Sequence, residues 1–194
     1  IKIKKKENKS KIFININNQT IDFEIKDLNI YNILASLTVL KALKVNFLKI
    51  KNKFKNIGTL EGRGKKYSIF RYKKNFKLID ESYNANPLSV KNAIKTLISI
   101  KKEKFKKYLI LGDMLELGPK SKKYHEDLSK VINNSDIDKV FIKGKKTLFT
   151  YKRLNKDKRG NILQNNEDID FSLSKIISNN DYLMIKGSNA TGLN

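Results

Sequence analysis

The amino-terminal part of the chain alternates apolar and polar positions in the way that half-buried strands do. Between residues 10 and 25, apolar side chains occupy every second position on both sides of Asn17-Asn18-Gln19, at Ile12, Ile14, Ile16, Ile21, Phe23 and Ile25. This alternation predicts an antiparallel hairpin. The period then changes to about 3.6 residues, and the apolar positions become Ile30, Ile33, Leu34, Leu37, Leu40 and Leu43. Here we expect a helix with one apolar face.

Two strand-like runs, 67–72 and 76–79, follow a stretch that contains Gly58, Gly62 and Gly64. From residue 76 onward, strand patterns and helix patterns alternate. We expect strands at 76–80, 107–112, 138–143, 161–164 and 181–186, and helices near 88–101, 121–133, 146–154 and 168–179. This order predicts an α/β fold with a mainly parallel sheet, helices on both faces and Rossmann-like right-handed crossovers. We place a domain boundary near residue 79.

Unusual loops follow several of the predicted strands. In a doubly wound sheet, ligands bind beyond the carboxyl ends of the strands. Segments that combine Gly or Pro with polar groups occur at those ends, at 80–87, 112–118, 144 and 186–189. Turn chemistry alone would account for one or two of them, so four on one edge favour a binding site there.

Composition narrows the possible chemistry of the 194-residue chain. It has no Cys and one His, His125, which excludes a disulfide framework, a Cys nucleophile and a His-rich metal site. No apolar run reaches the roughly 18 residues of a membrane span, and the amino terminus lacks a signal-peptide core. We therefore expect a soluble, cytoplasmic protein that lacks its true beginning in this sequence.

The net charge of +23 suggests a polyanionic partner, because cations that cluster on a surface release counterions from phosphate. Only 4 of the 42 cations are Arg, however, and the lysines are scattered among many Asn and Ile residues. Lys, Asn and Ile all have A/T-rich codons. We therefore interpret the charge as a result of compositional drift, which leaves a surface of solvated lysines. A basic nucleic-acid-binding module remains an alternative, and it would bind duplex DNA in a salt-dependent way.

The segment Ile79–Val90, IDESYNANPLSV, resembles the start of the C-terminal domain of the Mur ligases. It is most similar to the branch of that family that adds D-alanyl-D-alanine to UDP-N-acetylmuramoyl-tripeptide. Four more segments resemble family motifs in family order, at 29–35, 61–63, 112–118 and 185–188. The resemblance implies that residues 1–78 are the end of the central ATPase α/β domain and that 79–194 are the C-terminal domain.

The resemblance implies a set of ATP contacts at Asn29, Asn32, Arg63, Glu81, Tyr83 and Asn84. Arg63 would be catalytic, because a guanidinium suits the charge of the triphosphate. Glu81 stands where many members have Asp and would approach the ribose or its metal shell. The alternatives are that Asn29 caps a helix, that Arg63 is a solvated surface residue, and that Glu81 and the Asp before it are hinge or capping residues.

The resemblance also implies contacts with the incoming dipeptide. Asp113 and Glu116 would bind its ammonium group, while Lys186 and Ser188 would hold its carboxylate. The alternative for the two acids is an ordinary loop role. Asn189 stands where the family usually has Arg. We assign His125 a structural role, since a lone His on a helix is more often structural than catalytic.

The chain has no G-x-x-x-x-G-K-[ST] loop, which the chemistry of this family requires. We therefore expect the phosphate loop, the main Mg²⁺ ligands and the UDP-binding domain upstream, and no metal ligands in this part. The chain would then be a monomeric fragment, inactive alone, of a ligase that uses ATP, UDP-N-acetylmuramoyl-tripeptide and D-alanyl-D-alanine. Two alternatives stay open, a related ligase for single amino acids or glutamate and a non-catalytic relative that only binds a partner.

Overall fold

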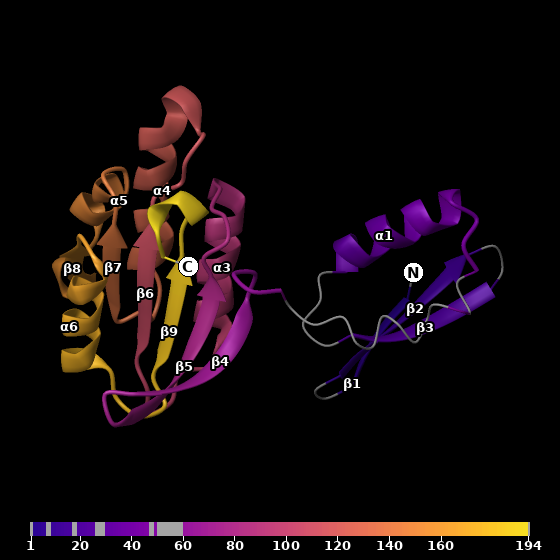
Figure 1. The fold of residues 1–194 in the computed structure, drawn as a ribbon, viewed down its shortest axis with the longest axis horizontal. Helices are drawn as coiled ribbons and strands as arrows, with labels where there is room; N and C mark the ends of the chain where they lie inside the picture. Colours follow the sequence, from indigo (N-terminus) through magenta and orange to yellow (C-terminus); the bar gives the residue numbers. More distant parts are fainter. Residues whose placement is uncertain are drawn as a thin grey trace. The chain divides into compact units, whose positions relative to one another are not determined.

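The computed structural model describes residues 2–6, 9–16, 19–25, 30–46, 49 and 60–193 (Figure 1). The chain forms two compact units, residues 1–59 and 60–194. The predicted turn at residues 17–18 and the candidate residue Asn29 lie outside the described residues.

The amino-terminal unit contains an antiparallel sheet of β1 (Lys2–Lys6), β2 (Lys9–Ile16) and β3 (Gln19–Ile25), in that order. The pairing of β2 with β3 confirms the predicted hairpin. Strand β1 was not predicted, because its sequence KIKKK has a single apolar residue and therefore no readable alternation. Helix α1 (Ile30–Ala42) buries Ile33 and Leu37 as expected, whereas Leu43 lies beyond the helix and is exposed.

The second unit is built on a six-stranded sheet in the order β4-β5-β9-β6-β7-β8. Its strands are β4 (Lys65–Arg71), β5 (Lys74–Glu81), β6 (Lys107–Gly112), β7 (Lys139–Lys143), β8 (Arg159–Leu163) and β9 (Tyr182–Lys186). Strand β4 is antiparallel to β5, and every other pair is parallel. The predicted mainly parallel α/β sheet is confirmed.

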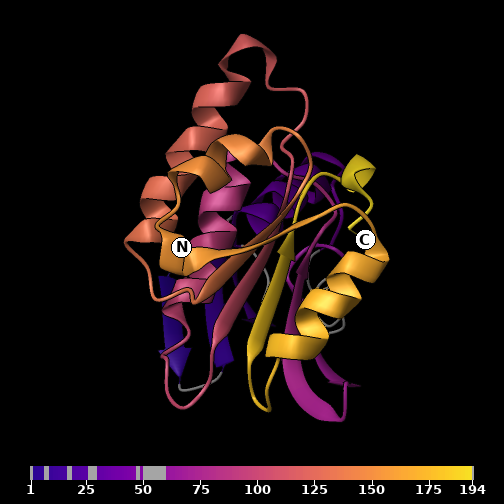
Figure 2. The same cartoon turned by 90° about the vertical axis from the view of Figure 1, so that its left-hand side faces the viewer.

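Helices cover both faces of this sheet (Figure 2). They are α3 (Pro87–Ser99), α4 (Ser121–Asn133), α5 (Thr147–Arg153) and α6 (Asn166–Ile176). Side chains of β6 alternate between two cores. Leu109 and Leu111 pack in the core with α3 and α4, while Tyr108 and Ile110 pack in the core with α6. The loops therefore lie along two edges of the sheet, one where the parallel strands begin and one where they end.

The boundary between the compact units differs from the one predicted near residue 79. Strand β5 pairs with β9 as well as β4, and its Phe76 and Ile79 are buried in the two cores of the second unit. Both β4 and β5 therefore belong to the C-terminal unit, which begins at Leu60. Alternation along a strand does not reveal which sheet the strand joins, so the sequence could not place this boundary.

Helix α3 begins at Pro87, one residue before the expected start near 88, and its N-cap is Asn86. The Asn86 side chain accepts a hydrogen bond from the Ser89 amide, and the Ser89 hydroxyl accepts one from the Asn86 amide. This reciprocal pair is a capping box with Pro at the first helical position. It fixes the point at which the loop after β5 turns into the helix.

Within the part of the chain that the structure describes, no helix has both the length and the apolar character needed to cross a membrane.

Candidate functional site

The four polar loops singled out in the sequence lie along one edge of the six-stranded sheet. Glu81 at the end of β5 pairs with Lys186 at the end of β9, and Lys186 in turn is level with Leu111 near the end of β6. Gly112 and Lys143 are level at the ends of β6 and β7. Parallel strands in register thus bring segments that are more than a hundred residues apart into one row.

Asp80 joins the end of β5 to the turn that precedes β4. Its carboxylate accepts hydrogen bonds from the Gly62 amide at 2.9 Å and from the Ser82 hydroxyl at 2.6 Å. The Tyr83 amide donates to the Gly62 carbonyl at 3.1 Å, and the Gly64 amide donates to the Asp80 carbonyl at 2.7 Å. The turn that carries Arg63 is therefore attached to the C-terminal unit.

Gly62 allows this close approach of turn and loop. Its φ is +69°, and a Cβ at this position would lie 2.7 Å from the Cβ of Tyr83. Any other residue would both strain the backbone and collide with the neighbouring loop.

Arg63 and Tyr83 form an exposed pair above this turn. The guanidinium carbon of Arg63 lies 4.2 Å from the centroid of the Tyr83 ring. Within the described residues, the guanidinium has no carboxylate partner, so its charge is available to a ligand. The ring restricts the side chain without neutralising it. Sequence reasoning named both residues, and the structure brings them together.

Glu81 and Lys186 form a partly buried ion pair beneath the same loop. The Lys186 ammonium lies 3.8 Å from the Glu81 carboxylate and donates to the carbonyls of Glu81 and Asn84. Burial lowers the pKa of Lys186, and the charge of Glu81 opposes this shift. Burial likewise raises the pKa of Glu81, and Lys186 opposes it. Desolvation of both charges outweighs their mutual attraction at this separation.

Asn84, in the same loop, has an exposed side chain. Its side-chain oxygen accepts a hydrogen bond from the Ala85 amide at 2.7 Å. This bond orients the side-chain amide group and leaves its NH₂ donors unused among the described residues. Asn84 thus has donors available to a ligand, and its contact with the nucleotide stays a prediction.

Asp113, expected to bind the dipeptide ammonium, is buried and caps helix α5. Its carboxylate accepts from the amides of Lys146 at 3.0 Å and Thr147 at 2.7 Å. Gly144, with φ +123°, lies so close that a Cβ there would be 2.4 Å from the carboxylate. These contacts account for both the acid after β6 and the glycine after β7 without a ligand.

Ser188 links the ends of β9 and β6. Its hydroxyl oxygen accepts from the Leu115 amide at 3.2 Å, and its amide donates to the Asp113 carbonyl at 3.1 Å. The hydroxyl proton of Ser188 has no acceptor among the described residues. Gly112 and Gly187 let the two strand ends approach, since a Cβ on Gly187 would lie 3.0 Å from the Gly112 Cα.

Glu116 is exposed in the loop after β6 and holds a positive φ of 59°. Its carboxylate makes no hydrogen bond or ion pair with another described residue. Of the four side chains expected to contact the dipeptide, Glu116 and Ser188 keep free polar atoms, whereas Asp113 and Lys186 have theirs occupied by protein groups.

Two candidate residues belong to the amino-terminal unit. Asn32 lies exposed on the first turn of α1, and Asn29 lies outside the described residues. Their part in nucleotide binding stays a prediction.

The groups that hold the site together were not among the predicted site residues, above all Asp80, Ser82 and the amides of Lys146 and Thr147. A signal existed for Asp80, because it lies within the segment 79–90 at the end of a buried strand. The partners of Asp113 depend on the order of strands in the sheet, which the sequence does not contain.

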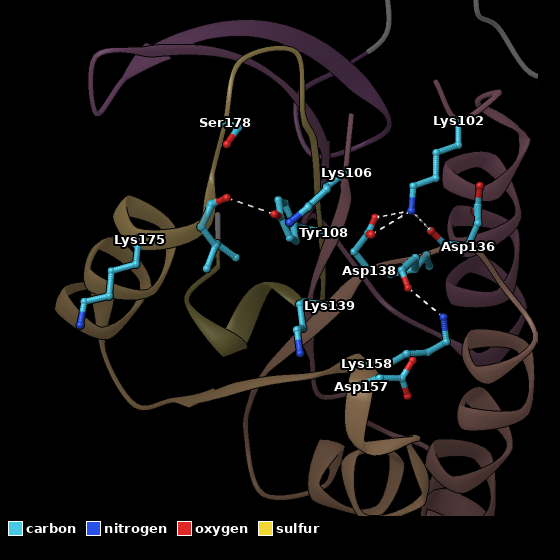
Figure 3. A pocket seen from close by; sticks show the side chains of 12 residues that line it. Lys102, Lys106, Tyr108, Asp136, Asp138, Lys139, Asp157, Lys158, Lys175 and Ser178 are labelled. Atoms are coloured by element: carbon cyan, nitrogen blue, oxygen red, sulfur yellow. Dashed lines mark hydrogen bonds and ion pairs between the residues drawn. The ribbon is translucent and has the colours of Figure 1, made fainter. Parts of the chain in front are cut away.

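A groove of about 650 Å³ lies at the opposite edge, where β6 and β7 begin (Figure 3). Lys102 contacts both carboxylate oxygens of Asp138 at 2.8 Å, and Lys158 donates to the Ser135 and Ile137 carbonyls. These charged groups of the groove are thus engaged within the protein, and the groove lies away from the four polar loops, so we do not assign the candidate site to it.

Among the described residues, no group of three or more His, Cys, Asp or Glu side chains is arranged to hold a metal ion.

Two relatives of known sequence match most of this chain. The chain is 28% identical over 170 residues to UDP-N-acetylmuramoyl-tripeptide--D-alanyl-D-alanine ligase of Bacillus subtilis, covering 86% of this chain and 37% of the relative. It is 30% identical over 138 residues to the protein of the same name from Rickettsia prowazekii, covering 71% of this chain and 29% of the relative. The chain thus spans well under half the length of these relatives.

A solved structure has the same fold. The MurF ligase of Thermotoga maritima, crystallised in complex with ADP, superposes with a TM-score of 0.74 and 21% identity, covering all of this chain and 43% of that one. Residues 68–189 match the family described as Mur ligase, glutamate ligase domain. This match covers β5 to β9 and the four polar loops at 80–87, 112–118, 144 and 186–189, and the chain therefore belongs to the Mur ligase family.

Proposed function

We propose that this chain is part of an ATP-dependent ligase that joins D-alanyl-D-alanine to UDP-N-acetylmuramoyl-tripeptide in peptidoglycan precursor synthesis. The names of both sequence relatives support the choice of substrates, and the ADP complex of the Thermotoga maritima protein supports the use of a nucleotide. Residues 60–193 would form the domain that closes over the nucleotide. The protein would act as a monomer and without a nucleic-acid partner.

The observation that carries the proposal is the exposed Arg63 guanidinium, stacked on Tyr83 at the edge where β5 ends. Bound ATP would phosphorylate the tripeptide carboxylate, and the dipeptide amine would then displace phosphate. Arg63 would stabilise charge on the transferred phosphoryl group, because a guanidinium forms paired hydrogen bonds with phosphate oxygens. Asn84 and Glu81 would orient the rest of the nucleotide from the same loop.

The dipeptide would bind further along the edge. Glu116 would accept hydrogen bonds from its ammonium group, and the Ser188 hydroxyl would donate its free proton to the carboxylate. Asp113 would position this subsite through α5 instead of contacting the substrate. Closure of the domain would exclude water from the activated carboxylate. Mg²⁺ would be held chiefly by residues elsewhere in the complete protein.

The proposal is tested by phosphate release from ATP with the complete protein that contains this chain. We expect release only when UDP-N-acetylmuramoyl-tripeptide and D-alanyl-D-alanine are both present. Omission of either substrate serves as the control. Release that depends on glutamate or another single amino acid, with none for the dipeptide, would refute the proposed substrate.

A further inference from the structure

Lys186 is buried at the end of β9, with 2% of its side chain exposed. Its ammonium group has three hydrogens. Two are donated to the carbonyls of Glu81 and Asn84, and the third side faces the Glu81 carboxylate at 3.8 Å. No donor is left for a substrate carboxylate, which is the role that the family resemblance implied.

The two carbonyls that Lys186 binds lie on either side of Tyr83. The two hydrogen bonds from Lys186 thus hold the segment 81–84 at the end of β9. A separate hydrogen bond joins the Tyr83 amide to the Gly62 carbonyl. The Tyr83 ring in turn contacts Arg63. A continuous set of contacts therefore runs from the buried ammonium to the exposed guanidinium.

We propose that Lys186 is a positioning residue that holds the loop 81–84, and through Tyr83 the Arg63 guanidinium, in the geometry that binds the nucleotide. Its effect on catalysis rests on the proposed function, whereas its effect on the loop does not. Loss of the ammonium removes the donor that Lys186 supplies to these two carbonyls, so the loop relaxes away from β9. Lys186 itself touches neither nucleotide nor dipeptide.

The chain contains a matched control at the other edge of the sheet. Lys107 is also fully buried at a strand end, donates to the carbonyls of Ile98 and Ile100, and pairs with Asp136 at 2.8 Å. Its contacts lie at the beginning of β6, away from residues 81–84. Replacing either lysine removes a buried ammonium with the same kinds of partner, but only Lys186 is tied to the site.

The test compares Lys186→Met and Lys107→Met in the complete protein. Hydrogen exchange, measured by mass spectrometry, reports on the loop without any need for activity. We expect faster exchange of the amides at 83–85 in Lys186→Met and unchanged exchange there in Lys107→Met. If Lys186→Met does not fold, Lys186→Gln takes its place. Equal exchange at 83–85 in both variants would overturn the proposal.

Kinetics of the same variants separate positioning from direct substrate contact. If Lys186 is a positioning residue, Lys186→Met should raise the KM for ATP about tenfold or more, which corresponds to the loss of roughly one hydrogen bond to a charged group. The KM for D-alanyl-D-alanine should be unchanged. Combining it with Arg63→Ala should cost little more than Arg63→Ala alone, because both act through one guanidinium. A raised KM for the dipeptide with unchanged KM for ATP would contradict this role.

The two proposals can fail separately. If the unmodified protein does not ligate the dipeptide, the proposed function fails, and the exchange result alone decides whether Lys186 positions the loop. If ligation is observed and exchange at 83–85 does not respond to Lys186, the proposed function stands and the positioning role fails.

Discussion

At the residue scale, the single histidine has a structural role, although histidine is often a catalytic residue. His125 is fully buried; its Nε2 accepts from the Met114 amide at 3.0 Å, and its Nδ1 lies 2.8 Å from the Ser121 carbonyl. An acceptor at Nε2 and a carbonyl at Nδ1 place the proton on Nδ1 and keep the ring neutral. The ring thereby fixes the start of the loop after β6, in the structural role expected from the sequence.

We predict that the pKa of His125 is below its ordinary 6.5, because burial disfavours the charged ring. The unfolded chain then takes up a proton first as pH falls. The contribution of His125 to stability is present above pH 6.5 and is lost as pH falls through the folded-state pKa. An NMR titration of the one imidazole measures this pKa, and urea unfolding from neutral pH to about pH 5 measures the slope. A pKa at or above 6.5 would contradict the account.

Gly62 offers a second test at this scale, because Gly118 provides a control with similar backbone geometry. Both have positive φ, +69° and +57°, but a Cβ at Gly118 would meet nothing within 4 Å. Gly118→Ala should therefore cost only the backbone strain of about 1–2 kcal/mol. Gly62→Ala should cost about 1–3 kcal/mol more, because it also pushes Tyr83 away. Urea unfolding compares the two, and equal losses would argue against the close packing of turn and loop.

At the scale of elements, helix α5 depends on a side chain from a different strand. The amides at its start are satisfied by Asp113, which follows β6. We predict that Asp113→Ala lowers the free energy of unfolding by about 1–2 kcal/mol, as the loss of a helix cap does. Asp113→Asn, which keeps one acceptor oxygen, should lose less. Unfolding by urea measures both, and an unaffected Asp113→Ala would mean that the cap contributes nothing.

The elements themselves were largely predictable. The bounds of β6 and α4 agree with the sequence pattern, because β6 is a continuous apolar run and α4 has a strong 3.6-residue period. Strand β1, which has one apolar residue, gave no such signal. Pairing between elements was harder, since the sequence shows neither that β4 and β5 join the large sheet nor that the Asp113 loop meets α5.

The candidate site was predictable in position but only partly in the role of each side chain. Loop motifs placed Tyr83 and Asn84 on one edge, and the family resemblance named Arg63; the structure leaves all three side chains exposed. Lys186 was expected to be accessible as well. With 38 lysines in the chain, nothing in the sequence distinguishes a buried ammonium from a solvated one. That distinction arises only when β9 is inserted between β5 and β6.

At the scale of the whole molecule, the division at residues 59 and 60 makes a prediction about folding. A fragment of residues 60–194 should unfold cooperatively, because it retains the complete six-stranded sheet. A fragment of residues 79–194 should fail to do so, since it lacks β4 and most of β5, including the buried Phe76. Circular dichroism during thermal unfolding distinguishes them. Cooperative unfolding of the shorter fragment would support the boundary near residue 79.

For the complete protein, we propose that this edge of the sheet serves a ligase that adds a dipeptide. The most direct measurement is a competition in which the complete protein receives ATP, UDP-N-acetylmuramoyl-tripeptide and an equimolar mixture of D-alanyl-D-alanine, D-alanine, L-alanine and D-glutamate. Mass spectrometry then identifies the product. The account predicts a single product extended by D-alanyl-D-alanine. A product extended by one amino acid, or ATP hydrolysis with no extended product, would contradict it.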